Sequence, residues 1–467
     1  LQDRRRTLHA ATVEAIERLY SDRLAEQVER LAHHAVRGRV LPKAVQYLRE
    51  AGSKAVNRSA NREAIAYFEE ALVLLDELPQ TTQTLTEALE IRMALGPALI
   101  AVKGAPSPEV EALYLRALEL VDQLGAGASR FPALWGLWFV NYTRGRYQVA
   151  LEAGERLLET ARKGNDTGEL LEAHHALWPT LTAMGRPLQA LVHAEQGLAL
   201  YDRERHGAYA FLYAGHDPGA CCRWNRGMTR WLLGYADSGL RDVQDAYRLA
   251  EELKHPMTTV IALWHTAWVH CQRGERELAI ASLDRLISLA RPHEFSVWID
   301  TSDALIHVMK RERTSVNAIA ELYRQLGSAQ YTTAWRRTAC ICVLAELCAD
   351  SEYADEGFQM LHSIPEEHRG AFGAPEILGL EGELLLKQEQ TALDEAKRRF
   401  QEAIELARDR GEKSFELRAA TSLARLLDRQ GRREEAHAAL AGVYGWFTEG
   451  FGTADLKAAK ALLQELS

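Results

Sequence analysis

Two segments far apart in the chain carry the same spacing of small and aromatic residues, and this repetition limits what the chain can fold into. Both place Ala, Phe and Ala at positions i, i+4 and i+7, which lie on one stripe of an α-helix. The stripe residues are Ala64, Phe68 and Ala71 in "ANREAIAYFEEALVLLDEL", and Ala396, Phe400 and Ala403 in "EAKRRFQEAIELA". Small residues let two helices approach closely while the Phe fills the remaining gap. The chain is therefore expected to contain repeated helix pairs.

Glycines mark the turns between the paired helices. They are Gly145, Gly185, Gly234, Gly274 and Gly431, and the first four are spaced by 40, 49 and 40 residues. Together with the A-x3-F-x2-A stripe, which is the second-helix signature of the tetratricopeptide repeat, they predict a repeat longer than the standard ~34 residues. The longest spacing implies an insertion between Gly185 and Gly234.

A single helix pair cannot bury its apolar face, so neighbouring pairs must stack into a superhelix with a concave side. No alternating pattern typical of strands is found. We therefore predict an all-α fold, a right-handed tetratricopeptide-repeat superhelix (α-solenoid) of roughly nine helix pairs, with degenerate repeats over 296–370. Residues 1–40 are expected to form an N-terminal helical segment, 41–467 the solenoid, and 453–466 a capping helix with Thr453 as N-cap.

Composition narrows the possible environments and partners. No apolar run approaches the ~18 residues of a membrane span, and the N-terminal residues lack the apolar core of a signal peptide. Six cysteines in 467 residues suggest free thiols in the cytoplasm. The net charge of −9 disfavours nucleic acid as a partner, although residues 1–60 carry 12 Lys and Arg against 7 Asp and Glu. This local excess suggests that the N-terminal region faces another part of a larger protein.

Three segments resemble the C-terminal tetratricopeptide region of large bacterial signalling proteins. They are residues 24–72, residues 197–222 with "GLALYDRERHGAYAFLYAGHDPGACC", and residues 417–466. Proteins of that class join an adenylate/guanylate cyclase-type or DNA-binding module to a STAND-class ATPase and then to the repeats. The resemblance implies that this chain is the sensor or partner-binding arm that regulates the ATPase, and that 1–40 is the remnant of the junction to it.

Catalytic motifs of such parents are not found in the sequence. No G-x4-G-K-[ST] phosphate loop occurs, since "REAGSKAVNRS" at 49–59 lacks the first glycine at the required spacing. No G-x-S-x-G nucleophile motif is present either. We therefore expect a chain that is not an enzyme and that needs no cofactor.

The stretch "YAGHDPGACCRW" at 213–224 is the main chemical alternative. A metal site would draw on His206, His216, Asp217, Cys221 and Cys222. The structural interpretation is that Asp217 caps a helix with Pro218 in its first turn, where the missing N–H costs nothing. Adjacent cysteines then lie ~100° apart and do not easily share one ion. We favour the cap and expect no metal.

An aromatic stripe gives the candidate binding site. Counting back 10, 6 and 3 residues from the turn glycines selects one stripe of each first helix, the stripe that lines the concave groove of tetratricopeptide proteins. The groove residues predicted in this way are Trp135, Phe139, Tyr142, His175, Trp224, Met228, Trp231, Trp264 and Trp268. Before Gly431 the same offsets select Thr421, Arg425 and Asp428, which are polar and are not among the predicted groove residues. Packing of the stripe into the core is the alternative.

Taken together, the sequence predicts a protein-interaction arm that binds a protein or peptide segment in its concave groove, with a segment of the same full-length polypeptide as one source. A sensor domain for a small-molecule ligand is the second hypothesis. A metal-dependent enzyme built on the insertion at 201–224 is the third. Neither nucleic acid nor a membrane is expected as a partner.

Overall fold

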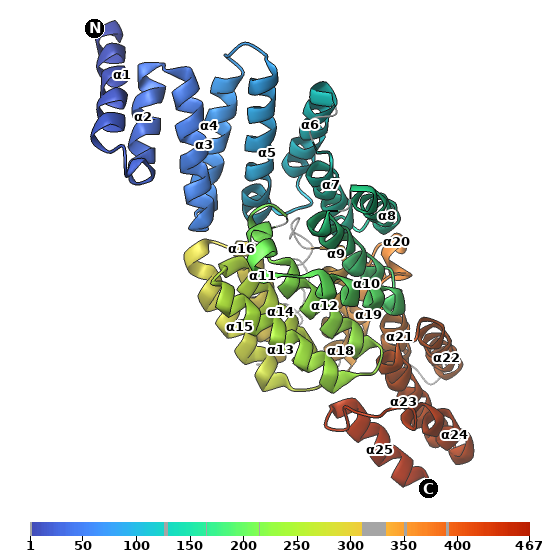
Figure 1. Cartoon of the computed structure of the whole chain (residues 1–467). Coiled ribbons are helices and arrows are strands. Elements are labelled where there is room, and N and C mark those ends of the chain that lie inside the picture. Colours follow the sequence, from blue (N-terminus) through green and yellow to red (C-terminus); the bar gives the residue numbers. More distant parts are fainter. Residues whose placement is uncertain are drawn as a thin grey trace. The chain divides into compact units, whose positions relative to one another are not determined.

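The computed structural model describes residues 2–125, 129–164, 166–213, 215–310, 333–349, 353–388 and 392–467. Within these ranges every regular element is a helix and none is a strand (Figure 1), which confirms the all-α prediction. None of the described helices is both long enough and apolar enough to span a bilayer. The chain divides into two compact units: Leu1–Val140 with Ala208–Gly215, and Asn141–Gly207 with His216–Ser467.

The first unit is a series of paired helices around one apolar core. Its elements are α1 (Gln2–Leu19), η1 (Leu24–Glu26), α2 (Val28–Gly38), α3 (Leu41–Asn57), α4 (Asn61–Leu75), α5 (Thr82–Lys103), α6 (Pro108–Leu124), most of α7 (Phe131–Thr143) and η3 (Gly207–Phe211). Val13 and Ile16 of α1 are buried in the same core as Leu48 of α3 and Phe68 of α4. Helices α1 and α2 therefore pack on the repeats that follow them, within one compact unit. A separate role for residues 1–40 stays a prediction.

The second unit continues the helix pairs. Its elements are α8 (Tyr147–Gly164), α9 (Thr167–Ala183), α10 (Pro187–Leu200), α11 (Arg203–His206), α12 (Pro218–Leu232), α13 (Ala236–Leu253), α14 (Pro256–Gln272), α15 (Arg276–Ala290), η4 (Arg291–His293), α16 (Ser296–Met309), α18 (Ala334–Ala349), α19 (Ala354–His362), α20 (Glu366–Arg369), α21 (Ala374–Gln388), α22 (Leu393–Arg410), α23 (Lys413–Arg429), α24 (Arg433–Tyr444) and α25 (Ala454–Leu466). Within the degenerate stretch 296–370, residues 311–332 lie outside the described residues.

The repeated Phe fills the same kind of gap in both units. Phe68 and Phe400 are fully buried, and each ring lies against a glycine of the preceding first helix, Gly52 and Gly382 respectively. A Cβ atom on either glycine would come within 2.5 Å of the ring. Glycine costs helix stability, so its presence at both positions reflects the close approach that the ring requires.

Capping residues set the ends of several helices. Asp166 accepts hydrogen bonds from the backbone N–H groups of Gly168 and Glu169 and so begins α9. Thr453 accepts a hydrogen bond from Leu456 N–H and begins α25 at the residue that the sequence predicts for the terminal helix. These bonds satisfy N–H groups that a helix leaves without an internal partner.

The later helices of the second unit pack on the turns of its earlier repeats. Three contacts define this packing: Phe372 N–H donates to the carbonyl of Ala183 at 2.8 Å, Arg418 donates to the carbonyl of Gln272 at 3.0 Å, and Ala454 N–H donates to the carbonyl of Arg273 at 3.0 Å. Each acceptor lies at the C-terminal end of a first helix, where backbone carbonyls have no intrahelical partner. The C-terminal repeats thus satisfy the helix ends of repeats that precede them by more than a hundred residues.

Two turn glycines, Gly274 and Gly431, show where the C-terminal repeats pack on an earlier turn. Gly274 has φ +76° and Gly431 has φ +75°, a backbone conformation that favours glycine at both positions. A Cβ on Gly274 would lie 2.5 Å from the Cβ of Ala454, whereas a Cβ on Gly431 would meet nothing within 4 Å. The two glycines therefore differ in what packs against them and not in their backbone.

We expect Gly274→Ala to destabilise the chain more than Gly431→Ala. Both variants place an alanine in the left-handed region, at about 1–2 kcal/mol, and only Gly274→Ala adds overpacking, at about 1–3 kcal/mol. Urea unfolding followed by circular dichroism measures both free energies. Equal losses would show that the C-terminal repeats do not press on this turn in solution.

Candidate functional site

The predicted aromatic stripe is buried. Exposed fractions are 2% for Trp224, Trp231 and Trp264, 6% for Trp268, 1% for Met228 and Trp135, 2% for His175 and 6% for Tyr142. Phe139 is partly exposed and stacks on Trp135 in the first unit, with ring centroids 5.6 Å apart. The open apolar surface that we expected of these residues is therefore not observed, and their contact with a ligand stays a prediction.

Side chains from the C-terminal repeats cover the stripe of the second unit. Phe415 packs edge-on against Trp231 with ring centroids 5.5 Å apart, and the guanidinium of Arg418 lies 5.2 Å from the centroid of the same indole. Trp335 of α18 packs edge-on against Trp264 at 5.5 Å. The same stripe of a first helix can face solvent or a later helix of its own chain, and here it faces the later helices.

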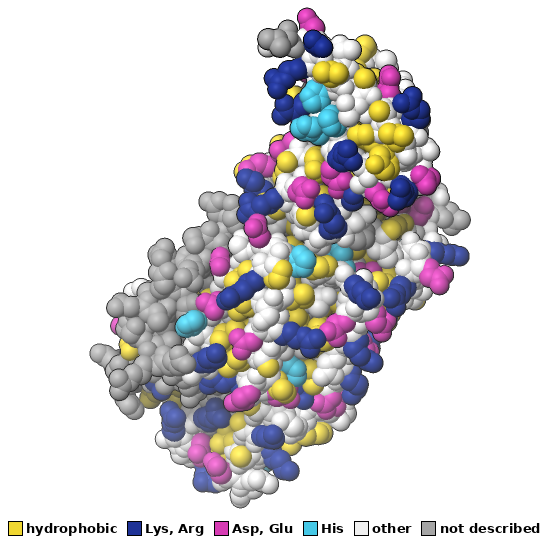
Figure 2. Space-filling view, turned by 90° about the vertical axis from the view of Figure 1, so that its left-hand side faces the viewer, with side chains coloured by type: hydrophobic (Ala, Val, Ile, Leu, Met, Phe, Trp, Pro, Cys, Tyr) yellow, Lys and Arg dark blue, Asp and Glu magenta, His cyan; other side chains and the backbone are white. Residues whose placement is uncertain are grey.

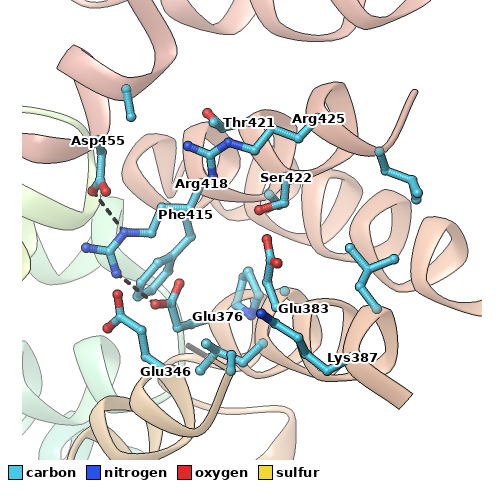
Figure 3. A pocket seen from close by; sticks show the side chains of 18 of the residues that line it. Glu346, Glu376, Glu383, Lys387, Phe415, Arg418, Thr421, Ser422, Arg425 and Asp455 are labelled. Carbon is cyan, nitrogen blue, oxygen red and sulfur yellow. Dashed lines mark hydrogen bonds and ion pairs between the residues drawn. The ribbon is translucent and has the colours of Figure 1, made fainter. Parts of the chain in front are cut away.

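A groove opens instead between the first helices of the C-terminal repeats. It has a volume of about 490 Å³ and is lined by residues of α18, α21, α23 and α25. Arg429 is part of the charged and polar lining, and Figure 3 labels the other charged and polar lining residues, which are Glu346, Glu376, Glu383, Lys387, Arg418, Thr421, Ser422, Arg425 and Asp455. Apolar side chains, among them Leu380, Phe415 and Leu426, complete the lining.

Arg418 fixes one end of the groove. Its guanidinium bonds the carboxylate of Glu376 at 2.7 Å and that of Asp455 at 2.9 Å (Figure 3). Burial alone would lower the pKa of Arg418, but Asp455 and Glu376 hold that pKa above its ordinary value. This arginine is therefore a fixed cation that ties α21, α23 and α25 together.

Four other charged side chains of the groove are available to a ligand. Arg425, Arg429 and Lys387 are exposed, and Glu383 is half-buried. Within the described ranges none of these four side chains forms an ion pair with another protein residue. Thr421 and Arg425 occupy two of the three offsets before Gly431 and line this groove, although the sequence analysis did not include them among the groove residues; Asp428, at the third offset, is not part of the lining. The polar character of the stripe there was the available sequence signal.

Charge elsewhere is mixed. On the face shown in Figure 2, Lys and Arg side chains alternate with Asp and Glu, and the described residues form no broad area of one sign. A nucleic-acid backbone is bound by clustered Lys and Arg. The visible face does not offer such a cluster over a large area.

The insertion before α12 folds largely as the structural interpretation predicts. Asp217 is the N-cap of α12, accepts a hydrogen bond from Ala220 N–H at 2.8 Å and is followed by Pro218 in the first turn. Its second carboxylate oxygen accepts a hydrogen bond from the Tyr201 hydroxyl at 3.0 Å. Cys222 donates to the carbonyl of Ala194 at 2.7 Å. Asp217 and Cys222 are thus engaged in hydrogen bonds of their own, whereas His216 and Cys221, two of the five residues weighed for a metal site, have their potential ligand atoms within 4.8 Å of each other.

Comparison with known proteins finds only low sequence similarity. No known protein-family model matches the sequence. An uncharacterized protein of Rhizobium meliloti (strain 1021) is 28% identical over 267 residues, which are 56% of this chain and 26% of that protein. The chain thus spans about a quarter of the length of this curated relative.

Solved structures with a similar course of helices are also distant. A Rap protein complexed with competence and sporulation factor has a TM-score of 0.46 and 15% identity, covering 74% of this chain and 99% of its own. The human IFIT1 dimer with m7Gppp-AAAA has a TM-score of 0.42 and 13% identity, covering 90% of this chain and 89% of its own. Likenesses this distant establish no shared function.

We expect Trp264→Ala to lower the free energy of unfolding by about 3–5 kcal/mol, because it empties a buried site that Trp335 and Arg336 cover. Trp446→Ala is the matched control, since Trp446 is 36% exposed, and it should cost clearly less. Denaturant unfolding monitored by circular dichroism measures both. A Trp264→Ala variant as stable as the wild type would restore the open-groove interpretation.

Proposed function

We propose that this chain is a non-catalytic protein-interaction arm that binds a peptide segment of a partner in the groove between α18, α21, α23 and α25. The observation that carries the proposal is the charge available in that groove, where Arg425, Lys387 and Glu383 line the same groove as Leu380 and Phe415 and form no ion pairs with the described residues. Charged side chains held beside apolar surface provide both orientation and contact area for a peptide.

The charge of the lining indicates the chemistry of the segment. Arg418 is neutralised by Glu376 and Asp455, which leaves Arg425, Arg429 and Lys387 as the accessible cations. A segment with an acidic side chain beside an apolar one fits this arrangement, because arginine binds carboxylates through paired hydrogen bonds. An open, polar groove supports a peptide better than a small molecule, which proteins enclose more completely.

We propose further that this chain is part of a longer signalling protein. The resemblance of residues 24–72, 197–222 and 417–466 to the repeats of STAND-class signalling proteins suggests that the groove regulates an ATPase in a longer polypeptide. An acidic segment of that polypeptide or of a second protein would then be the natural occupant. In either case this chain would bind the acidic segment, and the ATPase domain would hydrolyse ATP.

A phage-displayed library of random peptides tests the groove. We expect the wild-type chain to enrich peptides with an acidic residue beside an apolar one, and Arg425→Glu to weaken their binding by at least ~2 kcal/mol, which is about 30-fold in Kd. Lys460→Glu is the matched control, because Lys460 is exposed on α25 outside the groove lining. Equal binding by the Arg425→Glu variant, or a selection that enriches no peptide, would contradict the proposal.

A further inference from the structure

Two histidines and a cysteine converge inside the second unit. They are His175 of α9, His216 just before α12, and Cys221 in the first turns of α12. Their potential ligand atoms all lie within 4.8 Å of one another, and the Nε2 atoms of the two histidines are 3.2 Å apart. All three side chains are buried, with exposed fractions of 2%, 7% and 3%.

We propose that these three side chains bind a Zn²⁺ ion through Nε2 of His175, Nε2 of His216 and the thiolate of Cys221. Zinc prefers imidazole and thiolate ligands in tetrahedral geometry, with Zn–N bonds of about 2.0–2.1 Å and Zn–S bonds of about 2.3 Å. Two nitrogens on such an ion are about 3.3 Å apart, which matches the observed 3.2 Å. The fourth position of the tetrahedron is left for a non-protein ligand.

Glu172 completes the arrangement behind the first histidine. Its Oε2 atom lies 2.9 Å from Nδ1 of His175, and the carboxylate is fully buried. In metal sites a ligating histidine commonly donates its second N–H to a carboxylate, which directs the lone pair of the other nitrogen to the ion. Glu172 and His175 are three residues apart on α9, so the helix itself holds them in this register.

Two carboxylates lie near the Cys221 thiol, those of Glu172 and Asp217. A cysteine binds zinc as the thiolate, so zinc uptake at this site would release the thiol proton.

The sequence neighbours of two ligands point elsewhere and serve as controls. His174 pairs with His193, with their Nδ1 atoms 2.9 Å apart, and Cys222 donates to the carbonyl of Ala194. His174 is adjacent in sequence to His175, and Cys222 is adjacent to Cys221. Each control residue has the same side chain as the neighbouring ligand but points in a different direction from the helix.

Elemental analysis of the intact chain tests the site. The protein is purified without a polyhistidine tag or chelator, saturated with ZnCl₂, desalted and measured by mass spectrometry of the metal. We expect a single tightly held zinc ion in the wild type and in the His174→Ala and Cys222→Ala variants, and its loss in His216→Ala and Cys221→Ser. No retained zinc in the wild type, or zinc retained by Cys221→Ser, would overturn the proposal.

Cobalt spectroscopy keeps the proposal testable if a ligand variant fails to fold. Co²⁺ added to the metal-free wild type should give the visible absorption of a tetrahedral ion and a near-ultraviolet thiolate-to-metal band, and Cys222→Ala should retain both. Absence of the thiolate band in the folded wild type would refute coordination by Cys221. Glu172→Gln should weaken zinc binding by about 10–100-fold, and an unchanged affinity would remove Glu172 from the site.

Discussion

The second unit depends on how the chain accommodates one partly buried arginine. Arg418 lies against the Trp231 indole, donates to the carbonyl that ends α14, and pairs with carboxylates on α21 and α25. Removing one partner of an ion pair that is largely shielded from water leaves the other charge without compensation. The guanidinium can be satisfied only when the C-terminal repeats are docked on the earlier ones. The network therefore specifies this packing, whatever its net contribution to stability.

That docking explains two properties of the unit together. The first helices α12 and α14 present tryptophans to α18 and α23, so the aromatic stripe becomes core. The groove is lined by α18, α21, α23 and α25, and among the described residues of its lining Arg425, Arg429 and Lys387 are exposed, so the stripe of α23 stays open there. Aromatic residues suit the covered stripe and charged residues suit the open one.

The positions of the buried histidine and cysteine residues depend on where α12 begins. The insertion after α10 ends in Asp217, whose cap fixes the start of α12 and thus the directions of Cys221 and Cys222. A rotation of ~100° per residue sends one thiol toward α9 and the other toward α10. The same rotation separates His175 from His174 on α9. His175 and Cys221 therefore point toward each other, whereas their neighbours His174 and Cys222 contact His193 and the carbonyl of Ala194.

Local rules determined much of this protein from its sequence. The A-x3-F-x2-A stripes, the turn glycines and the caps at Asp217 and Thr453 predict helices, turns and helix starts where the structure has them, because each depends on neighbours a few residues away. Thr421 and Arg425 line the groove, but the sequence analysis did not count them among the groove residues because their offsets select polar side chains there.

Only the tertiary structure decided what each face meets. Trp231 and Arg425 occupy equivalent faces of first helices, yet Phe415 covers the former and solvent reaches the latter. His175 is part of the aromatic stripe by spacing, and its approach to His216 requires the fold of the insertion. Periodicity determines which residues share a helix face. The packing of distant repeats determines whether that face lies in the core, lines a groove or contributes a side chain to the proposed metal site.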